Sequence, residues 1–127
     1  MKQIVEITNN PKQKLDITLE KSNQSFTLLL EFSQTFIGYS CWYFAIKYND
    51  FLLGNDFVDT TITSPTIRLS TGINILRQYK NIIPFGLAII TEDLSEPMLL
   101  NDFVSGRVLV NVLTAEEVAD IENNLFV

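Results

Sequence analysis

The chain has 127 residues, of which 46% are hydrophobic and 19% charged, a composition typical of one globular domain. At this length a single core buries enough surface for stability without disulfides or a structural metal. Histidine is absent and Cys41 is the sole cysteine. These counts exclude Ser-His-Asp and Cys-His nucleophile systems, zinc sites built on histidine and an internal disulfide.

The formal net charge is −6. Proteins that wrap nucleic acid or bind anionic membranes need clustered cations, so the acidic balance disfavours both kinds of partner and is compatible with a basic protein partner. Glu6 stands where a signal peptide needs its apolar core, and no later segment has the ~18 uncharged apolar residues of a spanning helix. We therefore expect synthesis in a cytoplasm, without a nucleic-acid or membrane partner.

No repeat, low-complexity tract or linker divides the sequence, so residues 1–127 are predicted to form a single β-rich domain. Residues 13–20 alternate, with Leu15, Ile17 and Leu19 on one face, which is typical of a half-exposed strand. A more apolar strand over residues 26–32 follows the turn-like stretch 21–25. The two segments predict a hairpin.

The strongest aromatic strand is predicted for residues 40–48, where Trp42, Phe44, Ile46 and Tyr48 share one face. Asn49-Asp50 supplies a turn, residues 51–53 form a short strand, and residues 54–56 are a second turn or bulge. Further strand candidates are Ile62 and the segments 66–69 and 85–91. Periodicity leaves residues 72–79 open between a short strand and one helical turn.

A late strand is predicted for residues 107–113, and a capping box between Thr114 and Glu117 then begins a helix over residues 115–123. Val118, Ile121 and Leu125 give this helix an apolar stripe that covers an edge or open end of the sheets. The predicted fold is mainly β, an antiparallel sandwich or barrel-like meander with one short C-terminal helix. Alternation predicts a core of Leu15, Ile17, Leu19, Leu28, Leu30, Trp42, Phe44, Ile46, Leu87, Ile89, Val108, Val110 and Val112.

Candidate chemistry is sparse. Asp50, Asp56 and Asp59 are oxygen ligands, but their spacing does not fit a calcium loop and suits turns instead. The carboxylates of residues 92–96 resemble a solvated loop tip more than a catalytic pair. Cys41 lacks a neighbouring cation to stabilise a thiolate, and no glycine-rich phosphate or nucleophile motif occurs. We expect no catalytic residues, no metal, no cofactor and no enzyme activity.

Two segments are candidates for protein contacts. Residues 82–90 are apolar on both faces, which fits either a central strand buried between two layers or an edge buried against another subunit. The C-terminal helix carries carboxylates opposite its apolar stripe, so a basic neighbour could recognise it, although a solvated surface has the same pattern. The predicted interface residues are Ile82, Ile83, Phe85, Leu87, Glu116, Asp120 and Glu122.

Four segments in order carry a family resemblance: residues 13–19 (QKLDITL), 42–46 (WYFAI), 75–79 (ILRQY) and 85–87 (FGL). A Gln-initiated alternating strand, a Trp-containing strand, a Leu-x-x-Tyr segment and a Gly-Leu strand in this order resemble the small baseplate plug proteins of contractile-tailed phages. The stretch from Asn55 to Ser70 and the C-terminal helix depart from that family's pattern.

The resemblance implies a virion structural protein near the hub of the tail baseplate, where it helps to hold or close the tail tube. It would be made in the host cytoplasm, and its partners would be other tail and baseplate proteins or further copies of the chain. The alternative from another class is a small-ligand or carbohydrate-binding β-barrel, in which the aromatic strand would line a pocket.

Overall fold

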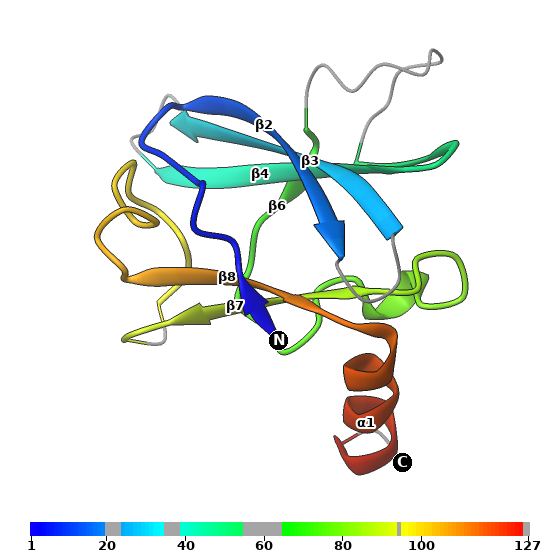
Figure 1. Ribbon diagram of the computed structural model, residues 1–127. Coiled ribbons are helices and arrows are strands. Elements are labelled where there is room, and N and C mark those ends of the chain that lie inside the picture. The colour runs from blue at the N-terminus through cyan, green and yellow to red at the C-terminus, as the bar shows by residue number, and fades with distance from the viewer. Residues whose placement is uncertain (20–23, 35–38, 55–64, 94, 126–127) are drawn as a thin grey trace.

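The computed structural model describes residues 1–19, 24–34, 39–54, 65–93 and 95–125. Two antiparallel sheets pack face to face as a sandwich, and one C-terminal helix lies beside the smaller sheet (Figure 1), which confirms the predicted mainly β class. The smaller sheet has the order β1 (Lys2–Gln3), β8 (Val108–Leu113), β7 (Gly86–Thr91). The larger has the order β2 (Lys12–Leu19), β3 (Gln24–Gln34), β4 (Ser40–Tyr48), β5 (Phe51–Leu53), and β6 (Ile67–Arg68) also pairs with β4.

The larger sheet follows the predicted alternation. Strands β2 and β3 form the expected hairpin, with Leu15 opposite Leu28, while most of its turn lies outside the described residues. Strand β4 has the predicted bounds, and its side chains Trp42, Phe44 and Ile46 are buried. One face of each strand therefore points to the smaller sheet, because successive side chains alternate between the two faces.

Asn49 and Gly54 lie in turns of this sheet, as predicted. Asn49 adopts a positive φ of 53°, a conformation that asparagine tolerates better than most residues, and it reverses the chain between β4 and β5. Gly54 has φ +80°, and a Cβ there would lie 2.8 Å from the carbonyl oxygen of Phe44, so glycine is required. The predictions for residues 55–64, including Ile62, Asp56 and Asp59, lie outside the described residues.

The smaller sheet contains one strand that the pattern did not predict. Strands β7 and β8 pair with Leu87 opposite Val112, as the two late apolar segments suggest. Strand β1 adds to β8 with Lys2 opposite Val112, and the Ile4 amide continues this pairing by donating to the Val110 carbonyl at 2.8 Å. Two strand residues are too few to establish a period of two.

Residues 72–79 contain the helical turn that the sequence left open, and only an isolated bridge in place of a short strand. Gly72 forms an isolated bridge with Ile89, and a short 3₁₀ helix, η1, spans Arg77–Tyr79. Between them, Asn74 Oδ1 accepts hydrogen bonds from the amides of Leu76 (3.0 Å) and Leu87 (3.3 Å). The Asn74 side chain thereby links the segment to β7 at a point where the two do not form a regular strand ladder.

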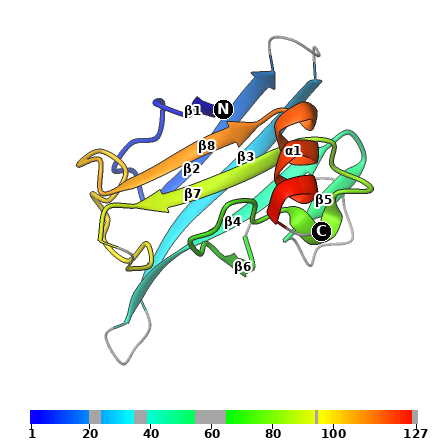
Figure 2. The ribbon, with the colours of Figure 1, turned by 90° about the horizontal axis from the view of Figure 1, so that it is seen from below.

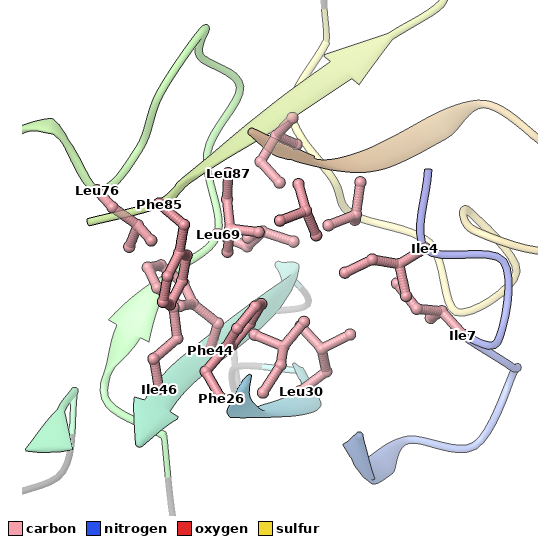
Figure 3. Close-up of a cluster of buried hydrophobic side chains, with 14 of the residues drawn as sticks. Ile4, Ile7, Phe26, Leu30, Phe44, Ile46, Leu69, Leu76, Phe85 and Leu87 are labelled. Carbon is pink, nitrogen blue, oxygen red and sulfur yellow. The ribbon is translucent and has the colours of Figure 1, made fainter. Parts of the chain in front are cut away.

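The core lies between the two sheets (Figure 3). Phe26 of the larger sheet stacks on Phe85 with ring centroids 4.2 Å apart, and Trp42 makes edge-on contacts with Phe32 and Phe103. The predicted core residues all belong to this cluster, although Leu15 and Ile17 of β2 are only partly buried. The cluster thus holds the two sheets together through aromatic and aliphatic contacts.

Helix α1 (Ala115–Leu125) packs against the outer face of the smaller sheet and not on an edge or open end, as Figure 2 shows. Val118 and Ile121 contact Ala88 of β7 and Leu113 of β8. The capping box is confirmed, since the Glu117 amide donates to Thr114 Oγ1 (3.2 Å) and the Thr114 amide donates to Glu117 Oε1 (3.1 Å). Leu125 is 57% exposed, so the predicted apolar stripe contacts the sheet only as far as Ile121.

Candidate protein-binding groove

A groove of about 530 Å³ lies on the outer face of the smaller sheet, between α1 and the segment 71–73. Its floor is the outer side of β7, with Ala88 beneath the helix and Ile90 beyond it. We call it the outer groove, and it is lined by Met1, Thr71, Gly72, Ile73, Ala88, Ile89, Ile90, Thr91, Leu113, Glu117, Asp120 and Ile121. Parts of both segments predicted for protein contacts therefore line the outer groove, but of the predicted interface residues only Asp120 is among these lining residues.

Exposed aliphatic side chains stand at the side and floor of this groove. Ile73 is 49% exposed and Ile90 is 43% exposed, and neither belongs to the clusters of buried residues. An apolar concavity with carboxylates from Glu117 and Asp120 at its rim has the layout of a protein interface, with an apolar centre and a polar border.

The helix wall is fixed by polar contacts at both ends. Near its start, Glu117 forms an ion pair with the amino group of Met1. Partial burial acts to raise the pKa of Glu117, but hydrogen bonds from Met1 and Thr114 outweigh it and hold the pKa below its ordinary value. Towards its end, Glu122 accepts from Arg77 Nε (2.8 Å) and Lys80 Nζ (3.1 Å), which ties α1 to η1.

The opposite wall is fixed by the strand-like segment before η1. Gly72 and Ile89 exchange backbone hydrogen bonds of 3.1 and 2.9 Å along the border of β7. Glu96 accepts from the Thr71 amide at 2.9 Å and from its hydroxyl at 3.1 Å. The wall carrying Ile73 is therefore held from both sides and presents its side chain on a preformed surface.

A buried ion pair holds the loop between β7 and β8. Arg107 donates through Nε to Asp102 Oδ1 (2.8 Å) and through a second nitrogen to Oδ2 (2.7 Å), and Asp102 is fully buried. The same guanidinium contacts exposed Asp93 at 2.9 Å. Every buried side-chain nitrogen or oxygen of the described residues has a hydrogen-bond partner. We interpret this cluster as structural, because its bonds are satisfied within the loop.

The interface predicted within residues 82–90 needs correction. Ile82 is 52% exposed, but Ile83, Phe85 and Leu87 are buried in the core between the sheets. These three side chains do not reach the surface, because the larger sheet covers the inner face of β7. The segment is apolar on both faces since α1 covers the outer side at Ala88. Burial between two layers is therefore confirmed for residues 86–89, but the predicted central position is wrong, because β7 is the edge strand of the smaller sheet and β8 is its central strand.

The predicted acidic helix face divides into free and engaged carboxylates. Glu116 and Asp120 are exposed. Glu122 differs, because its contacts with Arg77 and Lys80 leave little of its side chain accessible. Partial burial acts to raise the pKa of Glu122, but the hydrogen bonds from Lys80 and Arg77 hold that pKa below its ordinary value. Glu122 thus belongs to the support of the helix.

The remaining candidates fall in structural positions. Cys41 is buried, as expected of a core cysteine. Trp42 and Phe44 point into the core, and no β4 residue lines the outer groove. Among the described residues, no group of three or more metal-ligating side chains comes together. Within that same part of the chain, no helix has the length and apolar character needed to cross a membrane.

Sequence reasoning missed three parts of the groove and its support. It gave no role to Ile73, to Asn74 or to the pair Asp102–Arg107, because their contacts join residues that no single periodic pattern relates. Gly106, with φ +82°, marks the tight turn before Arg107 and is the one local signal of that loop's geometry.

Comparison of the chain with protein-family models and with curated proteins finds no match.

Proposed function

We propose that this protein is a structural component of a phage tail baseplate, placed near the hub, and that it acts through protein contacts at the outer groove. The observation that carries the binding role is the groove itself, where Ile73 and Ile90 stay exposed on a surface built from fixed elements. Solvent-exposed apolar concavities with polar rims are typical of interaction sites.

The phage assignment is supported by the resemblance of four segments, and their side chains have structural roles. Gln13 donates to the carbonyls of Thr8 and Asn10, both at 2.9 Å, and thereby closes the turn before β2. Trp42 Nε1 donates to the Leu99 carbonyl at 3.0 Å from a fully buried ring. Residues of this kind maintain a fold, which is the requirement of a structural subunit that carries no catalytic group.

The groove also suggests the character of its partner. Glu117 and Asp120 lie at its rim, Glu116 is exposed on the same helix, and the chain carries a net charge of −6. A neighbour with an apolar side chain flanked by Lys or Arg complements this surface, since such charges guide association and fix orientation. The proposed partner is therefore a basic surface of another tail protein.

The burial of the aromatic strand favours protein contact over the alternative of a small-ligand barrel. That hypothesis requires the aromatic side chains of β4 to line a pocket, but Trp42 and Phe44 fill the core between the sheets. In the sandwich, the smaller sheet covers the aromatic face of β4.

The test is complementation of a phage whose copy of this gene has been deleted. We expect wild-type protein to restore tail assembly and to be found in purified particles by mass spectrometry. Ile73→Asp and Ile90→Asp, which place a charge in the apolar groove, should reduce incorporation. Ile82→Asp is the matched control, because Ile82 is equally exposed but lies outside the groove.

Two outcomes contradict the proposal in different ways. If the deletion leaves tail assembly intact and particles lack the protein, the virion role is wrong. If the protein is present in particles and the two groove variants incorporate as well as Ile82→Asp does, the virion role stands and the groove is not the docking site. Thermal melts of each variant establish that lost incorporation does not reflect unfolding.

A further inference from the structure

The outer border of β2 is an open sheet edge. Strand β2 is the last strand of the larger sheet, and within the described residues no strand pairs with its other side, as Figures 1 and 2 show. The Phe32 amide donates to the Pro11 carbonyl, which fixes the hydrogen-bonding phase of the hairpin. Hydrogen-bonded and non-hydrogen-bonded residue pairs alternate along an antiparallel ladder. The backbone groups of Leu15 and Ile17 therefore bond to β3, while the backbone groups of Lys14 and Asp16 point outwards.

The apolar side of this border is also incompletely covered. Leu15 and Ile17 pack against the core but are only partly buried. A cleft of about 550 Å³ runs along the same flank, between the second half of β2 and strand β1, and Ile17 and Leu19 line it. An added strand would complete the ladder and cover these aliphatic side chains together.

The side chains of β2 are complementary to themselves in one antiparallel register. With a two-fold axis at Leu15, Lys14 lies opposite Asp16 of a second copy, and Asp16 lies opposite its Lys14. These are the residues whose backbone groups point outwards, so each pair exchanges two backbone hydrogen bonds and sets opposite charges side by side. Leu15 meets its own counterpart on the inner face.

Neighbouring registers add a like-charge pair. Moving the axis to Lys14 keeps Lys12 opposite Asp16 but places two lysines opposite each other, and moving it to Asp16 places two aspartates opposite each other. A shift by one residue places outward-pointing backbone groups opposite residues whose backbone groups already bond to β3, so the hydrogen bonds between the two copies cannot form. The sequence of β2 therefore favours one register.

We propose that this border is a homodimer interface, in which β2 pairs antiparallel with β2 of a second copy about an axis at Leu15. The larger sheets of the two copies then form one continuous sheet. A closed two-fold arrangement of this kind uses the same patch on both chains and leaves the open edge buried. The inference is independent of the outer groove, which lies on the other sheet.

The test measures self-association of the full chain by analytical ultracentrifugation over a wide range of concentration. We expect a reversible monomer–dimer equilibrium for the wild type. Asp16→Lys and Lys14→Asp each turn both symmetric pairs from attractive to repulsive, so each should raise the dissociation constant by about tenfold or more. The double variant Lys14→Asp/Asp16→Lys exchanges the charges and should restore dimerisation.

Asp50→Lys provides the matched control, since it makes the same charge change at an exposed turn on the opposite border of the sheet. Amide hydrogen exchange gives a second readout, because the Asp16 amide should become protected as concentration rises while the outward-pointing Leu52 amide of β5 should not.

A wild-type chain that stays monomeric at every concentration overturns the proposal. So does a dimer that tolerates Asp16→Lys as well as Asp50→Lys, or one in which the Asp16 amide gains no protection. A double variant that melts like the wild type and fails to dimerise refutes the register.

Discussion

The fully buried carboxylate of Asp102 allows a sharp test of what holds the loop between β7 and β8. Its two oxygens accept hydrogen bonds from Arg107 at 2.8 and 2.7 Å, and Oδ2 also accepts from the amides of Met98 and Leu99, each at 2.8 Å. Asp102→Asn keeps the size of the side chain but removes its charge. It also places an amide NH₂ donor against one set of these donors, which leaves hydrogen bonds unmade.

We expect Asp102→Asn to lower the free energy of unfolding by about 3–5 kcal/mol, the usual cost of breaking a buried ion pair at one partner. This is a large share of the roughly 5–15 kcal/mol that keeps a domain folded. Urea denaturation followed by tryptophan fluorescence measures it. The fluorescence also reports the loop directly, because the Leu99 carbonyl accepts from Trp42 Nε1.

Asp93→Asn is the matched control. Asp93 contacts the same guanidinium at 2.9 Å, but its side chain is 58% exposed, so water replaces the lost contact and the stability should change much less. If the two variants unfold at the same urea concentration, burial of the Asp102 charge is not what makes the pair important. If Asp102→Asn matches the wild type, the loop is held by its apolar contacts alone.

Three further predictions concern the core, the segment before β7 and pH. Trp42→Ala should cost about 3–5 kcal/mol in chemical denaturation, because the ring is fully buried; a stable variant would mean that the surrounding rings collapse into the space. Gly86→Ala should be destabilising in thermal melts, since its Cβ would lie 2.7 Å from Asn74 Oδ1, and adding Asn74→Ala should relieve part of the loss; strictly additive losses would contradict this. Burial acts to raise the pKa of Asp102, but hydrogen bonds from Arg107, Leu99 and Met98 outweigh it and lower the pKa below 3.8. The stability that this lowered pKa contributes is present above the ordinary pKa and is lost as pH falls through the lowered one. Lowering the pH below about 4 should therefore reduce the free energy of unfolding of the wild type more than that of Asp102→Asn. Equal losses in the two proteins would contradict this prediction.

Two strands of the larger sheet were predictable from the alternation of their side chains. In β2 the exposed and partly buried positions alternate through Ile17, and β4 has the predicted bounds because its inward aromatic residues face another sheet. Helix α1 begins at Ala115 because Thr114 and Glu117 carry a local capping signal that needs no tertiary information. In these elements local preference and tertiary environment agree.

Other features depend on contacts between distant residues, which a single sequence does not encode as a pattern. Strand β1 exists because β8 offers it an edge, and Asp102 is recognised as a buried charge only when Arg107 is seen beside it. The apolar residues 86–89 were ambiguous for the same reason. In the sequence, an aliphatic residue covered by the chain's own helix, such as Ala88, cannot be told from one that stays exposed, such as Ile90.

The two proposed contact surfaces lie on different sheets, and this separation makes them independently testable. The outer groove is on the face of the smaller sheet that points away from the core, whereas the β2 border belongs to the larger sheet. Pairing through β2 would leave the floor of each copy's groove open, because β7 takes no part in it, although the first turn of α1 lines the cleft beside β2. Ile73→Asp should therefore leave the monomer–dimer equilibrium unchanged in ultracentrifugation. A loss of dimer in Ile73→Asp would show that the groove itself mediates self-association, and the β2 register would then lack support.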